Sequence, residues 1–435
     1  MLAIRTRNIT EIFELLGDQI LYWNMALRPW YEQPLGGGPS SAGGTTIGPA
    51  FIWTMWGIRH LVGPWTTYLP HAGGIGLSII QSVADVLFLA AIWTRFDSLA
   101  LALATTLFLA TGPEDMSLSA SIWNPPLAVA FVKISMAFVM SNERGKSLWK
   151  DAAATAAAVL AVQVHSSAIF FAAPAIVSLI GRDVLAGRRA QAVRVACALA
   201  AVILLLEAPY LIDRALHMEK RASPAIVVAS VSYTITHPAT LRLGAAYGAL
   251  ANACQALLIR PWTFAWFGLL LAAAAVAAAI TMRSELSLLG ATVLPLGAVV
   301  LGFSFWQQAF QHYWYMTMMP SVALTFGLAL TAWKRAAMPS AAIFLAAVVA
   351  AQPARFRDAQ VINRLPTYGV LVRGSQEIRR RTAEIRSIDI EFPVEPSTQK
   401  HYVYERVLHG RVTPTAAFAA TIHRSGEVEF RRVSH

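Results

Sequence analysis

The 435-residue sequence is 56% hydrophobic and only 14% charged, and its mean hydropathy is +0.52. Soluble domains carry about 25% charged residues, so the composition excludes an ordinary soluble protein and indicates a polytopic membrane protein. The net charge of +11 does not indicate nucleic-acid binding. The basic residues lie in short loops between apolar runs and in the C-terminal tail, where they set membrane orientation.

The first candidate residue is a lone carboxylate, Asp18, in an apolar and aromatic stretch that leads into the glycine-rich loop at 36–38. An acid beside a membrane segment is costly, which makes it a functional candidate by default. The alternative is an acid on the wet face of a helix that lies along the bilayer surface. The loop has no Lys-Ser/Thr after its glycines, so it is not a phosphate-binding loop.

Residues 17–26, GDQILYWNMA, resemble the first-loop motif of GT-C membrane glycosyltransferases. Those enzymes take a sugar from a polyprenyl phosphate, and they include protein O-mannosyltransferases and lipid A aminoarabinose transferases. Asp18, Tyr22 and Ala26 match the motif, whereas Gln19 stands where a second acid is usual. The resemblance implies that Asp18 is catalytic and that Tyr22 contacts substrate. The family normally has a membrane helix before this motif. Either that span is missing from the sequence or the protein lacks it.

Apolar runs then follow along the chain and predict about 9–11 apolar helices. A helix needs ~20 residues to cross the membrane. The runs lie at 47–64, 74–94, 98–112, 125–141, 151–165, 166–181, 195–209, 262–282, 286–305, 313–333 and 338–351. The 98–112 and 151–165 runs are short, and we expect half-spans or broken helices there.

Basic loops at 144–150, 182–194, 283 and 334–335 predict the side of the membrane that each segment faces. They place 112–125, 210–261, 304–312 and everything after 352 on the external side. If Asp18 is external too, one run between 47 and 112 cannot cross the membrane. We expect that run to be 98–112.

The external segment 112–125 contains an acid pair, Glu114 and Asp115. GT-C enzymes often carry a second acidic group in such a loop, so the resemblance implies a catalytic role for this pair. Two carboxylates at one site can hold a divalent cation against the donor phosphate, which makes a metal ion the cofactor to test for. The alternative is that the acids stabilise a helix N-terminus.

Two more places supply candidate substrate-binding residues. His165 stands between two short apolar runs, where it either contacts substrate or is simply hydrogen-bonded. The stretch 210–261 is rich in basic residues, among them Arg260, which suit a lipid phosphate. Its apolar patches, 225–231 and 243–259, predict helices that lie on or dip into the interface.

The late segment His312-Tyr313, followed by Pro320, resembles an Arg-Tyr motif with a later proline in many GT-C enzymes. Histidine here replaces the arginine. If that arginine grips the donor phosphate in relatives, His312 would do so when protonated or by a hydrogen bond alone. The alternative is an aromatic belt at the membrane interface with a proline kink in a membrane helix.

The composition changes at 352, where charges become frequent and long apolar runs stop. We therefore divide the chain into a GT-C-like transmembrane domain, 1–351, and a small α+β soluble domain, 352–435, on the external face. Residues 375–385 predict a helix and 388–392 a strand. Residues 418–423 and 428–433, joined through Ser425-Gly426, predict a β-hairpin. The basic helix either meets anionic lipid or is solvated.

The sequence and the resemblance together predict a glycosyltransferase of the bacterial inner membrane. It would move a sugar from a polyprenyl phosphate to a lipid, glycan or protein acceptor at the periplasmic face, with Asp18 as general base. One alternative is a polytopic transporter or lipid flippase, although the two halves of the sequence show no repeat. Another is a non-catalytic relative of the same fold.

Overall fold

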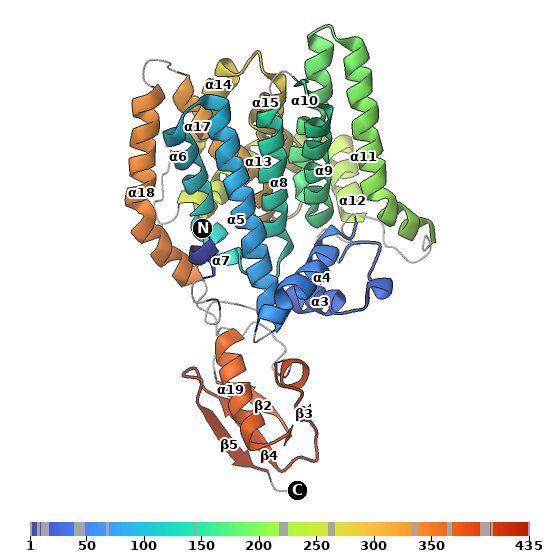
Figure 1. The fold of residues 1–435 in the computed structure, drawn as a ribbon, viewed down its shortest axis with the longest axis vertical. Helices are drawn as coiled ribbons and strands as arrows, with labels where there is room; N and C mark the ends of the chain where they lie inside the picture. Colours follow the sequence, from blue (N-terminus) through green and yellow to red (C-terminus); the bar gives the residue numbers. More distant parts are fainter. Residues whose placement is uncertain are drawn as a thin grey trace.

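The protein is a bundle of apolar helices with a small α+β unit at one end (Figure 1). The structure, a computed structural model, describes residues 2–6, 9, 17–38, 48–66, 69–142, 145–216, 225–259, 266–332, 337–362, 368–391, 401 and 403–433. Within these ranges, five helices are long and apolar enough to cross a membrane: 69–96, 124–141, 166–185, 189–216 and 337–359. The chain is therefore an integral membrane protein, as its composition predicts.

The N-terminal elements are short and lie at the lower end of the bundle in Figure 1. They are α1 (Leu2–Arg5), α3 (Gly17–Ala26), η1 (Trp30–Glu32), α4 (Ala50–Val62) and η2 (Gly63–Trp65). The α4 helix lies beside α3 at this end, whereas α6 (Leu99–Ala110) runs back along α5 (Leu69–Phe96) and α18 (Ala337–Ile362). The α6 helix has 12 residues and is not among the five helices long enough to cross a membrane, in line with the expectation for 98–112. The α4 helix, with 13 residues, is also shorter than those five.

The centre of the bundle is built on α8 (Asn124–Ser141), which packs against α5 on one side and α9 (Leu148–Val164) on the other. The short α7 (Pro113–Leu118) follows α6. After α9, η4 (Ser166–Ala168) leads into α10 (Ile169–Leu185), which is followed by α11 (Arg189–Leu216). The α9 helix is continuous over 17 residues, so no break occurs inside the 151–165 run.

The second half of the bundle contains several short helices. They are α12 (Ala225–Thr236), η6 (Pro238–Thr240), α13 (Leu243–Cys254), η7 (Gln255–Ile259), α14 (Phe267–Thr281), α15 (Leu286–Ala291), α16 (Val293–Ser304), η8 (His312–Met318) and α17 (Met319–Thr331). Leu250 and Cys254 of α13 are buried in the main apolar core, and α13 packs against α16 and η8. One face of α13 thus packs into the bundle, whereas its start, Leu243 to Ala245, is exposed.

The C-terminal unit contains α19 (Tyr368–Arg381), η9 (Val403–Val407) and five strands. The strands are β1 (Glu384–Ile385), β2 (Ile388–Ile390), β3 (Arg411–Val412), β4 (Phe418–Ile422) and β5 (Val428–Arg432). One sheet has the order β2-β4-β5, and β1 pairs with β3. The β4–β5 hairpin confirms the prediction for 418–433. The predicted helix starts earlier, at Tyr368, and ends at Arg381, because 384–385 form a strand. The α18 helix continues through position 352 to Ile362.

Candidate functional site

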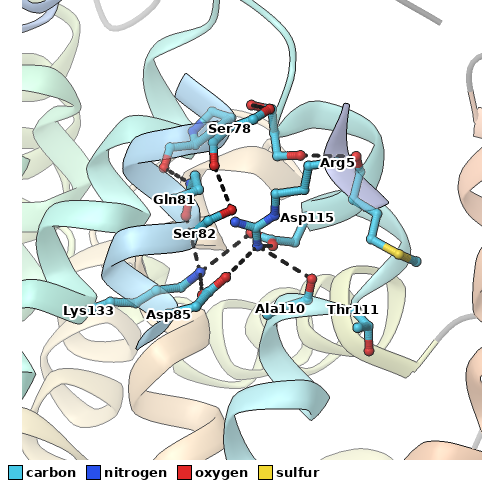
Figure 2. Close-up of polar contacts among 12 residues, drawn as sticks. Arg5, Ser78, Gln81, Ser82, Asp85, Ala110, Thr111, Asp115 and Lys133 are labelled. Carbon is cyan, nitrogen blue, oxygen red and sulfur yellow. Dashed lines mark hydrogen bonds and ion pairs between the residues drawn. The ribbon is translucent and has the colours of Figure 1, made fainter. Parts of the chain in front are cut away.

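Four charged side chains meet inside the bundle: Arg5, Asp85, Asp115 and Lys133, which we call the ionic cluster (Figure 2). Lys133 Nζ lies 2.7 Å from Asp85 Oδ1 and 3.9 Å from Asp115 Oδ1. Arg5 Nη2 lies 3.0 Å from Asp85 Oδ2 and also pairs with Asp115 Oδ2. All four side chains are buried. Two cations thus neutralise two carboxylates in a place where an unpaired charge would be strongly unfavourable.

Each member of the ionic cluster comes from a different helix. The packed helices α5 and α8 supply Asp85 and Lys133, and α1 supplies Arg5. The α7 helix begins with Pro113, whose ring suits the first position of a helix. Its first turn carries the acids 114 and 115, where the helix dipole favours negative charge. Asp115 therefore belongs to the ionic cluster and also stands at the helix N-terminus, whereas Glu114 shares only the second position.

Neighbouring polar groups hold the ionic cluster in place. Gln81 Oε1 accepts a hydrogen bond from Lys133 Nζ at 3.1 Å, and Gln81 Nε2 donates to the carbonyl of Pro126. Arg5 Nη2 also donates to the Ala110 carbonyl at 3.4 Å. The Nε and Nη1 atoms of Arg5 have no hydrogen-bond partner among the described residues. Arg5 therefore retains donor capacity that faces the cluster rather than water.

A second polar cluster lies where α9, α10 and η8 meet. His165 Nδ1 is 2.7 Å from Ser167 Oγ, which is 3.1 Å from Thr317 Oγ1. The ring of His165 meets Tyr313 edge-on with a centroid distance of 6.1 Å, and Tyr313 also packs on Trp123 at 5.1 Å. Trp123 directly precedes α8, so this second cluster adjoins the helix that carries Lys133.

An apolar cavity of about 180 Å³ lies between α6, α14, α17 and α18. Its lining includes Phe108, Phe267, Phe344 and one charged residue, Arg355. Arg355 donates to Thr111 Oγ1 at 2.7 Å and to the Phe108 carbonyl at 2.7 Å. Arg355 therefore joins the apolar cavity to the end of α6, where Arg5 also donates to the Ala110 carbonyl.

The sequence-predicted residues have different positions. Glu114 and Asp115 are buried together in α7, and His165 meets Tyr313. Tyr22 is buried against Phe51, with ring centroids 5.0 Å apart. His312 is exposed beside Tyr313.

Two candidates are not fully described. Asp18 lies in the first turn of α3, but its side chain is outside the described part of the structure. Arg260 lies outside the described residues altogether.

Our reading of the sequence missed Arg5, Asp85 and Lys133. Asp85 and Lys133 were detectable, because each is a lone charge within an apolar run, and such charges are functional candidates by default. Arg5 gave no comparable signal, since it stands among the charged and polar residues of the first ten.

A divalent metal does not fit the observed surroundings of Asp115. One carboxylate oxygen is paired with Arg5, and the other faces Lys133 at 3.9 Å. Two cationic side chains thus take the positions that a metal ion would need. Among the residues that the structure describes, no group of three or more His, Cys, Asp or Glu side chains is arranged to hold a metal ion.

No protein-family model matches the chain. No curated protein matches it either. Among solved structures, the chain is similar to the crystal structure of ArnT from Cupriavidus metallidurans bound to undecaprenyl phosphate. The sequence identity is 14%, the TM-score is 0.47, and the match covers 95% of this chain and 85% of that chain.

Proposed function

We propose that the protein is a GT-C-type membrane glycosyltransferase that moves a sugar from a polyprenyl phosphate to an acceptor hydroxyl. The observation that carries this proposal is the buried acid pair of α7, Glu114 and Asp115, set beside two buried cations inside an apolar bundle. Charges at such a position are costly and are retained for function. The motif at 17–26 supports the same class of enzyme.

The reaction requires little from the leaving group, because a polyprenyl phosphate departs readily. The acceptor oxygen attacks the anomeric carbon while the carbon–oxygen bond to phosphate breaks, and the phosphate leaves with the bonding electrons. A carboxylate takes the proton of the acceptor hydroxyl. Asp18 has this role in our proposal. Asp115 is less suited to it, because one of its carboxylate oxygens pairs with Arg5 and the other faces Lys133.

The ionic cluster has a different part in the proposed mechanism. Asp115 holds the side chains of Lys133 and Arg5 at the end of α7, next to Glu114. The Nε and Nη1 atoms of Arg5 are the donors of the cluster that its carboxylates leave without a partner among the described residues. Donors at fixed positions favour a departing phosphate, because they need no reorganisation during the reaction. The apolar cavity behind Arg355 suits part of a prenyl chain. We place the active site and residues 368–433 on the external face, following the positions of the basic loops.

The test is a transfer assay in membranes that carry a labelled polyprenyl-phosphate sugar. We expect Asp18→Asn to lower turnover by roughly 10²–10⁴-fold. Glu114→Gln and Asp115→Asn should lower turnover as well. Asp97→Asn is the matched control: Asp97 is exposed, and its backbone φ of 49° is one that asparagine adopts readily. Full activity in Asp18→Asn would refute its role as the base.

A transporter is the second candidate, and one specific observation favours it. Asp85 and Lys133 form an ion pair between two packed apolar helices, and such pairs also mark transport pathways. Vesicles containing the protein distinguish the two functions. Movement of labelled lipid across the bilayer, with no labelled product at any acceptor concentration, would replace the glycosyltransferase proposal with the transporter.

A further inference from the structure

A pocket with polar walls lies where α5, α8 and α10 end and α15 begins. Figure 1 shows these helix ends at the end of the bundle away from the C-terminal unit. The volume of the pocket is about 320 Å³. Polar side chains and apolar side chains both line it: Arg95, Arg182, Ser284, Glu285, Ser287, Val139, Met140, Leu286 and Leu288. We call it the basic-end pocket. A pocket with charged and apolar walls suits an amphipathic ligand.

The two arginines of the basic-end pocket are largely buried, with side chains 11% and 10% exposed for Arg95 and Arg182. Arg182 Nη2 lies 2.8 Å from Asp151 Oδ2 and 3.2 Å from Asp183 Oδ2. Its Nε has no hydrogen-bond partner among the described residues. Arg182 therefore contributes a fixed positive charge to the wall of the pocket, held in place by the two aspartates.

The Arg95 side chain is paired differently. It forms an ion pair with Glu285, which is itself 38% exposed. Glu285 lines the pocket and directly precedes α15. An incoming anion can replace its carboxylate at Arg95 while Glu285 turns to water.

The surroundings of the basic-end pocket favour an anion. The described residues of this end carry eight basic side chains: Arg95, Lys146, Lys150, Arg182, Arg188, Arg189, Arg194 and Arg283. They carry four acidic ones: Asp97, Asp151, Asp183 and Glu285. Trp93 and Trp149 are exposed nearby. Tryptophans of this kind lie at the level of lipid headgroups, and basic pockets between membrane helices bind anionic headgroups.

We propose that the basic-end pocket binds the phosphate of an anionic phospholipid from the adjacent leaflet. The phosphate oxygens accept hydrogen bonds from Arg95, Arg182 adds positive charge to the same wall, and the serine hydroxyls at 284 and 287 complete it. The apolar side chains of α8 and α15 face the glycerol and upper acyl segments. Glu285 competes with the phosphate for Arg95 and so limits the affinity.

The test measures lipid binding to the full-length protein in detergent by native mass spectrometry. Dioleoyl phosphatidylglycerol is titrated against dioleoyl phosphatidylcholine. We expect one tightly bound phosphatidylglycerol per protein. Arg95→Gln should weaken it by about tenfold or more, since charge-assisted hydrogen bonds are the strong ones. Glu285→Gln should tighten it. Arg283→Gln removes an exposed positive charge two residues away and is the matched control.

The outcomes separate a defined site from general attraction. Equal losses in Arg95→Gln and Arg283→Gln would show that only the diffuse positive charge of this end attracts the lipid, and would overturn the proposal. Equal binding of phosphatidylcholine would also overturn it. Soluble glycerol phosphate is the third ligand in the titration. If it occupies the pocket as tightly as phosphatidylglycerol, the ligand is a soluble phosphate ester and the lipid assignment is wrong.

Discussion

Lys133 Nζ lies 2.7 Å from Asp85 Oδ1, and this ion pair joins α8 to α5 in the interior of the bundle. Both side chains are almost completely buried. The helices α5 and α8 also pack against each other. The ion pair therefore helps to specify how the two helices pack, in addition to attracting them to each other. A buried pair of this kind is costly to break by removing one partner, because the remaining charge has no water to solvate it.

Replacing Lys133 by methionine should destabilise the protein by about 3–5 kcal/mol, because two carboxylates then share only Arg5. The double variant Lys133→Met/Asp85→Leu restores charge balance and should recover much of the loss. Thermal unfolding in detergent measures both. An unfolding temperature of Lys133→Met equal to that of the wild type would contradict the importance of the pair.

Arg5 should matter to stability in spite of its position near the N-terminus. Arg5→Met leaves the carboxylates of Asp85 and Asp115 with only one cation between them, so we expect a loss of stability and of transfer activity. Arg28→Met removes an exposed arginine from the same end of the chain and should have little effect. Unfolding temperature and turnover are measured for Arg5→Met and Arg28→Met. Equal behaviour of the two variants would place Arg5 outside the working site.

Gly112 permits the close approach of α7 to the carbonyl of Leu257. A Cβ at Gly112 would lie 2.5 Å from that backbone oxygen. Gly112→Ala should therefore push α7 and its acids away from the ionic cluster, at a cost of about 1–3 kcal/mol. Gly57→Ala in α4 is the control, because its Cβ would meet nothing within 4 Å. We expect transfer activity to fall in Gly112→Ala and to stay unchanged in Gly57→Ala. Unchanged activity in Gly112→Ala would show that α7 has no part in the site.

The C-terminal unit should lose local stability as the pH rises above about 6.5. A hydrogen bond to the carboxylate of Glu391 raises the pKa of His423 above its ordinary value of 6.5, with further support from Glu429 and Glu427. Protonated His423 is thus favoured in the folded state. The stabilisation is fully present below the unfolded pKa and is lost as the pH rises through the folded one.

Amide-exchange protection of β4 and β5, corrected for the intrinsic rate, measures this dependence in the full-length protein. In the wild type, protection should fall as the pH rises above about 6.5. In His423→Gln it should stay level. His409→Gln removes an exposed histidine from the same unit and should keep the wild-type profile. A level profile in the wild type would contradict the role of His423.

Local patterns in the sequence predicted most of the helices and the β4–β5 hairpin. The hairpin follows from alternating strands around Ser425-Gly426, and Gly426 has the positive φ of 90° that such a turn requires. The apolar runs also predicted α5, α8 and α10. A segment in lipid must satisfy its backbone hydrogen bonds internally, so a long apolar run forms a helix.

The ionic cluster could not be predicted in the same way. Arg5 and Asp115 are separated by 110 positions, and no local pattern reports a contact over that distance. The acid pair at 114–115 was visible, but its partners depend on how α1, α5 and α8 pack. The α13 helix shows the same limit. Its apolar pattern fits an interfacial helix and a core helix equally, and only its packing against α16 and η8 shows which face is buried.

The separation of Asp85 and Lys133 by 48 positions has a consequence for biosynthesis. The ribosome makes about 5–20 residues per second, so Asp85 is made roughly 2–10 s before its lysine partner exists. During that interval Asp85 lacks its lysine partner, and Arg5, which is made earlier, is the cation that can pair with it. An aspartate at the centre of a membrane helix costs roughly 2.5–3.5 kcal/mol for insertion. The apolar length of α5 outweighs this cost. The arrival of α8 then converts a reversible insertion into a stable helix pair.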